Sequence, residues 1–352
     1  MFPSLLTALL FSFSAIFANR SIKELGTTRA NLGRLLVAII LLGTYAHLFG
    51  HGMSGEGRNW FLISGVIGMG LGDLALFAAM PRLGARLTVL MCQCVAVPIA
   101  IQAEWMWMGT RLTVAQIGWA ALIIVGVAVA LMPSKRNPPK VPVTALGFLF
   151  GFLAAVGQGL GAVVSRHAYE LTTAAGESID GISAAYQRIS GGLLITAAYF
   201  VAKHFLTRSS QPSTWAPAAL AASAAGSHAE DPPTSNTTPT VGASAASCPS
   251  DPPSKSVASP TVRQRIFNLI GDKRRGWLFV IANAFCGPAL GVSCYQWALA
   301  TTPSGIVLPI VATTPLVIIP FSYWLEGDRP SVRSVLGGVI AVVGVVALTL
   351  VR

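Results

Sequence analysis

The residue best suited to chemistry in this sequence is Asp73, which lies among small and apolar residues in the stretch GMGLGDLALFAAM. An acidic side chain in an apolar span is costly to bury, and it marks a functional site by default. A carboxyl group there can bind a cationic group of a substrate, or take up and release a proton. The alternative is structural, because an arginine such as Arg188 could pair with Asp73 and lock two helices together.

Five further residues in apolar stretches are candidates for binding a substrate: Gln93, Glu104, Gln158, Arg188 and Tyr295. Gln93 and Gln158 could hydrogen-bond a ligand, although hydrogen bonds between helices are the commoner use of such amides. Arg188 could bind an anionic group, or it could extend its guanidinium group to the membrane surface.

Glu104 and Tyr295 each have a plain structural alternative. Trp105 and Trp107 follow Glu104 and are typical of a membrane interface, so the Glu104 carboxyl group could simply reach water. Tyr295, together with the neighbouring Gln296 and Trp297, forms an aromatic and polar face. Such a face is more often packing or an interfacial belt than a binding site.

The histidines and cysteines indicate neither a metal site nor a cofactor site. The five cysteines lack metal-ligand spacing, and His47 and His51 have no acid or cysteine at such a spacing. Phosphate-binding-loop, nucleophile-elbow and zinc-protease motifs are also missing from the sequence. We therefore expect no metal, no cofactor and no enzymatic activity.

The composition is that of an integral membrane protein. The 352 residues are 53% hydrophobic and only 11% charged, whereas soluble proteins have about 25% charged residues. The net charge of +11 could suggest nucleic acid as a partner. The basic residues lie between apolar runs, however, which is typical of loops on the cytoplasmic side of a membrane. We therefore expect membrane lipids as partners and no nucleic acid.

Ten apolar segments, each about long enough to cross a bilayer, predict an all-α polytopic protein. They are Phe2–Asn19, Gly33–Gly50, Trp60–Met80, Ala85–Met108, Val114–Met132, Thr144–Ser165, Ala184–Phe205, Gly276–Ala298, Gly305–Leu325 and Val332–Val351. Three pairs of glycines with the spacing G-x-x-x-G predict close helix contacts. They are Gly68 and Gly72, Gly157 and Gly161, and Gly287 and Gly291.

The sequence also repeats itself. Gly109–Val127 matches Gly327–Val345 at a constant offset of 218 positions, and each copy contains the turn motif G-x-R-x-[ST]. Earlier in the chain, Arg34 matches Arg188 at an offset of 154. The change of offset locates an insertion rich in Ala, Ser, Thr and Pro, for which we predict disorder. We therefore predict a five-helix repeat at 1–133, a linker at 134–143, and a second repeat at 144–351 with a disordered loop at 207–262.

Because each repeat has an odd number of helices, equivalent loops must lie on opposite sides of the membrane, and the two repeats are inverted. Most of the 24 Lys and Arg residues fall on the side of the loops that follow odd-numbered helices. The positive-inside rule then places both termini outside and the long loop inside.

This pattern resembles the EamA-type branch of the drug/metabolite transporter superfamily over nearly the whole chain except the insertion. The family has Gly-Glu-Arg at the turn, whereas this chain has Gly109-Thr110-Arg111 and Gly327-Asp328-Arg329. The resemblance implies a secondary carrier or exporter of small metabolites or drugs, with a central cavity between the halves. It also implies a multi-pass location, which we expect to be the bacterial inner membrane.

We therefore expect alternating access to a site near the mid-plane, with Asp73 as the main polar anchor and as a route for proton coupling. Two other classes of function are alternatives. An intramembrane enzyme acting on lipid-linked substrates would need paired carboxylates at one depth, and only Asp73 and Glu104 are candidates. A non-transporting sensor or scaffold would need a folded domain in the long loop.

Overall fold

A computed structural model describes residues 1–83, 85–132, 143–209, 274–317 and 332–351. Met1–Val201 and Leu269–Arg352 form one compact unit, and Ala202–Asn268 form a second. The helix contacts and the polar clusters described below all belong to the first unit.

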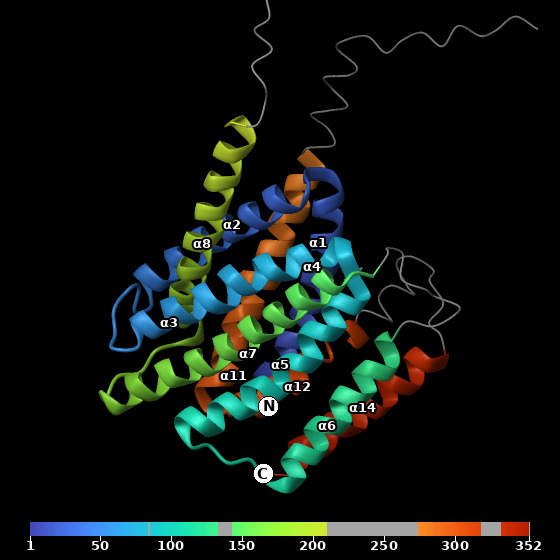
Figure 1. Cartoon of the computed structure of the whole chain (residues 1–352). Helices are drawn as coiled ribbons and strands as arrows, with labels where there is room; N and C mark the ends of the chain where they lie inside the picture. Colours follow the sequence, from blue (N-terminus) through green and yellow to red (C-terminus); the bar gives the residue numbers. More distant parts are fainter. Residues whose placement is uncertain (84, 133–142, 210–273, 318–331, 352) are drawn as a thin grey trace, which may run out of the picture. The chain divides into compact units, whose positions relative to one another are not determined.

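All regular structure in the described residues is helical (Figure 1). The first half contains α1 (Phe2–Leu25), α2 (Thr27–Leu48), α3 (Arg58–Gly65), the π-helical segment η1 (Val66–Gly72), α4 (Asp73–Leu83), α5 (Ala85–Met108) and α6 (Val114–Leu131). The second half contains α7 (Ala145–Ala174), α8 (Gly181–Ser209), the π-helical segment η2 (Phe285–Gly291), α11 (Val292–Thr301), α12 (Ser304–Val311) and α14 (Val332–Leu350).

Eight helices among the described residues are long and apolar enough to cross a membrane, which confirms an all-α polytopic membrane protein. One of these spans, Arg58–Leu83, is built from α3, η1 and α4, and another, Arg274–Thr301, contains η2 and α11. The other two of the ten predicted segments fall on α8 and on the shorter apolar helix Ser304–Val317. The predicted end of the latter, the linker at 134–143 and nearly all of the disordered loop lie outside the described residues.

The predicted glycine contacts are confirmed. A Cβ atom on Gly157 would lie 2.7 Å from the Cα atom of Gly72, and one on Gly161 would lie 3.0 Å from the Cα atom of Gly68. These distances leave room only for hydrogen, so η1 and α7 approach at backbone contact. The third pair brings η2 against α1, because a Cβ atom on Gly291 would lie 2.6 Å from the ring of Phe11.

The helices α6 and α14 run antiparallel and in close contact; they are drawn in green and red in Figure 1. A Cβ atom on Gly126 would lie 2.6 Å from the backbone nitrogen of Ala341, and one on Gly344 would lie 2.7 Å from the side chain of Ile123. Residue numbers thus rise along one helix as they fall along the other.

The first predicted turn motif is confirmed in its details. Gly109 has φ +69°, a conformation that residues with a Cβ atom rarely adopt. Thr113 then caps α6, with its hydroxyl accepting from the Gln116 amide at 3.2 Å while the Gln116 side chain accepts from the Thr113 amide at 2.9 Å. The second copy, at Gly327 and Ser331, lies outside the described residues.

Candidate functional site

Arg188 is the centre of a buried polar cluster. The residue lies on α8 and is only 3% exposed. Its Nη1 atom donates hydrogen bonds to the carbonyl oxygen of Gly161 at 3.2 Å and to the hydroxyl of Ser165 at 2.8 Å, both on α7. Its guanidinium carbon lies over the ring of Tyr295, 5.5 Å from the ring centroid. The alternative that Arg188 extends to the membrane surface is therefore wrong, because the side chain is directed into the protein.

Ser64 and Gln296 complete this cluster, and both are fully buried. The Ser64 hydroxyl on α3 donates to the Gly161 carbonyl at 2.6 Å and lies 2.7 Å from the Ser165 hydroxyl. The Gln296 amide on α11 donates to the Ser165 hydroxyl at 3.2 Å. The cluster therefore joins side chains and backbone of α3, α7, α8 and α11.

Four buried polar atoms in this region have no hydrogen-bond partner within the described residues. They are the Nε atom of Arg188, the hydroxyls of Tyr169 and Tyr295, and the Oε1 atom of Gln296. A buried donor or acceptor is normally paired, and leaving one unpaired costs about 1–3 kcal/mol. Unpaired polar atoms gathered near a buried cation are what a site for a polar ligand requires.

Gln158 lies on the face of α7 that carries this cluster. It precedes Ser165 by seven residues and Tyr169 by eleven, spacings that place all three on one side of the helix. Gln158 is half-buried, as is Gln93 on α5. Gln158 can therefore extend the polar face of α7, whereas the hydrogen bonds of the cluster given above do not involve Gln93.

Asp73 forms an ion pair, as its structural alternative predicted, but with a different arginine. Its Oδ2 atom lies 2.9 Å from Nη2 of Arg34 on α2, with side chains that are 20% and 18% exposed. The Nε atom of Arg34 also donates to the Asn31 side chain at 2.8 Å, and its guanidinium carbon lies 6.0 Å from the centroid of the Phe77 ring. The ion pair therefore joins α2 to the start of α4.

The alternative that Glu104 simply reaches water is also wrong. Glu104 is 2% exposed, and its Oε2 atom accepts from the Ser304 amide at 2.8 Å and from the Ser304 hydroxyl. It thus caps the first turn of α12 from the neighbouring helix α5. Nε of Arg166 lies 3.7 Å from Oε1 of Glu104, which is an ion pair too long for a hydrogen bond. Glu104 therefore holds α5, α7 and α12 together.

Of the six predicted site residues, the structure brings Arg188 and Tyr295 together and places Gln158 on the same helix face as Ser165, which accepts a hydrogen bond from Arg188. Ser64, Ser165 and Tyr169 were not predicted, since small hydroxyls and tyrosines are common in membrane helices. The seven-residue spacing of Gln158 and Ser165 is the sequence feature that could have indicated Ser165, because it places both side chains on one face of a helix. Within the described ranges, no three His, Cys, Asp or Glu side chains gather as a metal site requires.

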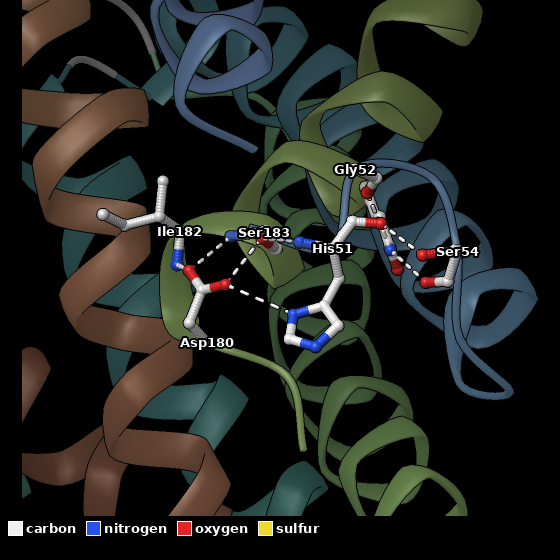
Figure 2. A network of polar contacts seen from close by, with 7 residues as sticks. His51, Gly52, Ser54, Asp180, Ile182 and Ser183 are labelled. Carbon is white, nitrogen blue, oxygen red and sulfur yellow. Dashed lines mark hydrogen bonds and ion pairs between the residues drawn. The ribbon is translucent and has the colours of Figure 1, made fainter. Parts of the chain in front are cut away.

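A second polar network fastens the loop between α2 and α3 to the start of α8 (Figure 2). Asp180 is its hub, because Oδ1 accepts from the amides of Ile182 and Ser183 at 2.9 Å and Oδ2 accepts from the Ser183 hydroxyl at 2.6 Å. The Nδ1 atom of His51 lies 3.7 Å from Oδ2. Gln187, next to Arg188, donates to the carbonyl oxygen of Gly52 at 3.0 Å. The network thus fixes the end of α8 that carries Arg188.

Replacing Asp180 with alanine is expected to lower the free energy of unfolding by about 1 kcal/mol at neutral pH, because the cap of α8 is lost. Burial raises the pKa of the Asp180 carboxyl, but the hydrogen bonds from Ser183 and Ile182 and the nearby His51 together lower it by more, so the net pKa is below the usual value of 3.8. The carboxylate therefore stabilises the fold above that pH, and this contribution is lost as the pH falls through the lowered pKa.

Thermal unfolding of the wild type, Asp180→Ala and Asp180→Asn over a pH series tests this. Asparagine also caps helices, so Asp180→Asn should lose less stability than the alanine variant. A gap between wild type and Asp180→Ala that stays constant down to the acid end of the series would contradict the assignment.

Comparison with known proteins gives one family and one fold. The model of the EamA-like transporter family matches residues 2–132 and 258–350. No curated protein matches the chain. Among solved structures, one described as the crystal structure of a protein is 17% identical, with a TM-score of 0.62, and the match covers 99% of this chain and 96% of that chain. At this identity the likeness shows the fold alone.

Proposed function

Because the chain belongs to the EamA-like transporter family, it is a membrane transporter of small molecules and not an enzyme, and we propose that it is a secondary transporter that works by alternating access. In this proposal the chain has ten membrane helices in two inverted repeats of five. The substrate binds at the cluster of Ser64, Ser165, Arg188, Tyr295 and Gln296. Rocking of one repeat against the other opens that cluster to each side in turn.

The observation that carries this proposal is the reciprocal contact between α6 and α14. Gly126 lies against Ala341, and Gly344 lies against Ile123. At the repeat offset of 218, Gly344 is the equivalent of Gly126, and Ala341 is the equivalent of Ile123. The same contact therefore occurs twice, with each residue replaced by its equivalent in the other repeat. Such a reciprocal contact is the signature of a two-fold axis. Since the two helices are antiparallel, that axis lies across them, as inverted repeats require.

The π-helical segments support the same arrangement. The segments η1 and η2 each have seven residues and begin 219 positions apart, one more than the repeat offset. Each of them also packs against the other half of the chain, because η1 contacts α7 of the second half while η2 contacts α1 of the first half. π-helical segments within α-helices are frequent at functional sites, since they disrupt the regular hydrogen bonding of a helix.

The proposed site lies where helices of the two halves meet. Ser64 comes from the first half, whereas Ser165, Arg188 and Gln296 come from the second, so the hydrogen bond between Ser64 and Ser165 crosses between the halves. A substrate held there contacts both halves and can be released when they move relative to each other. The bacterial inner membrane remains our predicted location.

Vesicles test the transport function directly. The purified full chain is reconstituted into vesicles loaded with a mixture of small metabolites, and mass spectrometry follows which compounds leave the lumen. Release of a defined subset from vesicles with protein, but not from vesicles without it, is the expected result. Equal retention of every compound in both would refute secondary transport and favour a sensor or scaffold.

Proton coupling through Asp73 remains a prediction, and its ion pair with Arg34 supplies a mechanism. Protonation would neutralise the carboxyl group and weaken the 2.9 Å contact that joins α2 to α4. Asp73→Asn is therefore expected to reduce uptake driven by a pH gradient about tenfold or more. Exchange of internal for external substrate should continue, because exchange needs no net proton movement. Full pH-driven uptake by Asp73→Asn would remove Asp73 from the coupling mechanism.

A further inference from the structure

We infer that Arg188 is the counter-ion for an oxyanion of the transported molecule, a carboxylate or a phosphate. This inference rests on the proposed function and adds the chemical class of the substrate. It is carried by a difference between two arginines at equivalent positions of the two predicted repeats, Arg34 and Arg188.

Each of the two arginines lies over an aromatic ring. Arg34 lies over the ring of Phe77, with its guanidinium carbon 6.0 Å from the centroid, and Arg188 lies over the ring of Tyr295 at 5.5 Å. Phe77 and Tyr295 follow the two π-helical segments, which begin 219 positions apart, and the two rings are 218 positions apart. Aromatic rings at nearly equivalent positions thus face the two cations, which makes their differences informative.

Only one of the two arginines has a carboxylate in contact with it. Asp73 pairs with Arg34 at 2.9 Å and is the first residue of α4, whereas the first residue of α11 is Val292. The segment Phe285–Thr301 contains no acidic residue. Within the described part of the chain, Arg188 forms no ion pair within 4 Å, although it is 3% exposed and more deeply buried than Arg34. Asp73 attracts Arg188 only at longer range. A buried cation without a counter-ion in contact is costly and is retained at functional positions.

The unpaired atoms suit an oxyanion. The Nε atom of Arg188 is buried without a partner, and the guanidinium fork presents adjacent N–H groups that bind two oxygens of a carboxylate or phosphate. The buried hydroxyl of Tyr295 is a further unpaired donor. Gly68 provides space for the guanidinium group, because a Cβ atom there would lie 2.8 Å from Nη2 of Arg188.

Arg188 is not needed to satisfy the groups that it contacts. The carbonyl oxygen of Gly161 also accepts from Ser64 at 2.6 Å, and the Ser165 hydroxyl also accepts from Gln296 at 3.2 Å. Replacing Arg188 with methionine therefore leaves no new unpaired partner and removes a buried charge that no carboxylate contacts. A purely structural arginine would predict lower stability for this variant, whereas a ligand-binding arginine predicts equal or higher stability.

The first experiment measures anion binding by the purified full chain in detergent. The probes are inorganic phosphate, acetate and the neutral acetamide, at matched ionic strength in chloride, and the readout is the thermal unfolding midpoint. The wild-type midpoint should rise saturably with phosphate or acetate and not with acetamide. Without anion, Arg188→Met should have an equal or higher midpoint than the wild type, and it should bind the anion about 100-fold more weakly. The anion affinity of Arg188→Lys should lie between those of the wild type and Arg188→Met.

Arg111→Met is the matched control, since it removes the same charge from an exposed residue and should keep the wild-type response. The inference is overturned if the wild type responds to neither anion, if acetamide acts as the anions do, or if Arg188→Met keeps the wild-type response. Tyr295→Phe serves as a second variant, because it keeps the ring below Arg188 and removes only the hydroxyl.

The second experiment separates this inference from the transport proposal. Among the compounds released from loaded vesicles, those that depend on Arg188 should carry a carboxylate or a phosphate, and the two head groups are told apart by mass. Release of cationic or neutral compounds only would overturn the inference while leaving transport intact. Release of nothing would refute transport, and the binding experiment would still decide whether Arg188 holds an anion.

Discussion

Replacing Gly65 with alanine is expected to destabilise the protein strongly, because the added methyl group overlaps the backbone of a neighbouring helix. A Cβ atom on Gly65 would lie 1.7 Å from the carbonyl oxygen of Arg188 and 3.1 Å from the amide nitrogen of Gly192. Both of these atoms belong to the backbone of α8, so a rotamer change cannot relieve the overlap. The helices α3 and α8 must move apart, at a cost of at least about 3 kcal/mol.

This separation also affects the site. Ser64 is the residue next to Gly65, and its contacts with Gly161 and Ser165 position the hydroxyls around Arg188. Gly65→Ala is therefore expected to lower both the unfolding midpoint and the anion affinity, measured by thermal unfolding with and without inorganic phosphate.

Gly338→Ala is the matched control for Gly65→Ala, because nothing lies within 4 Å of a Cβ atom at Gly338. Alanine at that helical position should be neutral or stabilising by up to about 1 kcal/mol. Equal stability of the two variants would contradict the close contact of α3 with α8.

Replacing Arg34 with methionine is expected to lower the free energy of unfolding by about 3 kcal/mol, because Asp73 would be left as a largely buried carboxylate without its counter-ion. The same substitution at the equivalent Arg188 is expected to leave the free energy of unfolding equal or higher. The comparison is internally controlled, since both variants remove one guanidinium group from above an aromatic ring.

A double-mutant cycle measures the ion pair itself. Arg34→Met, Asp73→Leu and the double variant are compared by thermal unfolding, and the double variant should recover a large part of the stability that Arg34→Met loses. A double variant whose loss equals the sum of the two single losses would show that the two side chains do not interact. Arg34→Met and Arg188→Met with equal losses would remove the asymmetry on which the anion inference depends.

Local patterns in the sequence were enough for the helices and several of their contacts. The apolar segments predicted α5 with its observed bounds, because hydropathy requires only neighbouring residues. The end of α7 was predicted at Ser165, whereas the helix continues to Ala174. The glycine spacing predicted close helix contacts, although not that η1 would meet α7, and the Thr113–Gln116 capping box depends on only four consecutive positions. The turn motif and the repeat indicated the family, which the family match then confirmed.

Only the tertiary structure decided which polar groups meet. Asp73 pairs with Arg34 and not with Arg188, and Glu104 caps a helix that begins 200 residues later in the chain. Those outcomes depend on which helix faces come together, and apolar segments of similar composition can pack in many ways. The sequence by itself determined a helical membrane transporter of this family. The packing alone left Arg34 in contact with a carboxylate and Arg188 without such a contact, since a charge is compensated by the groups that surround it in space.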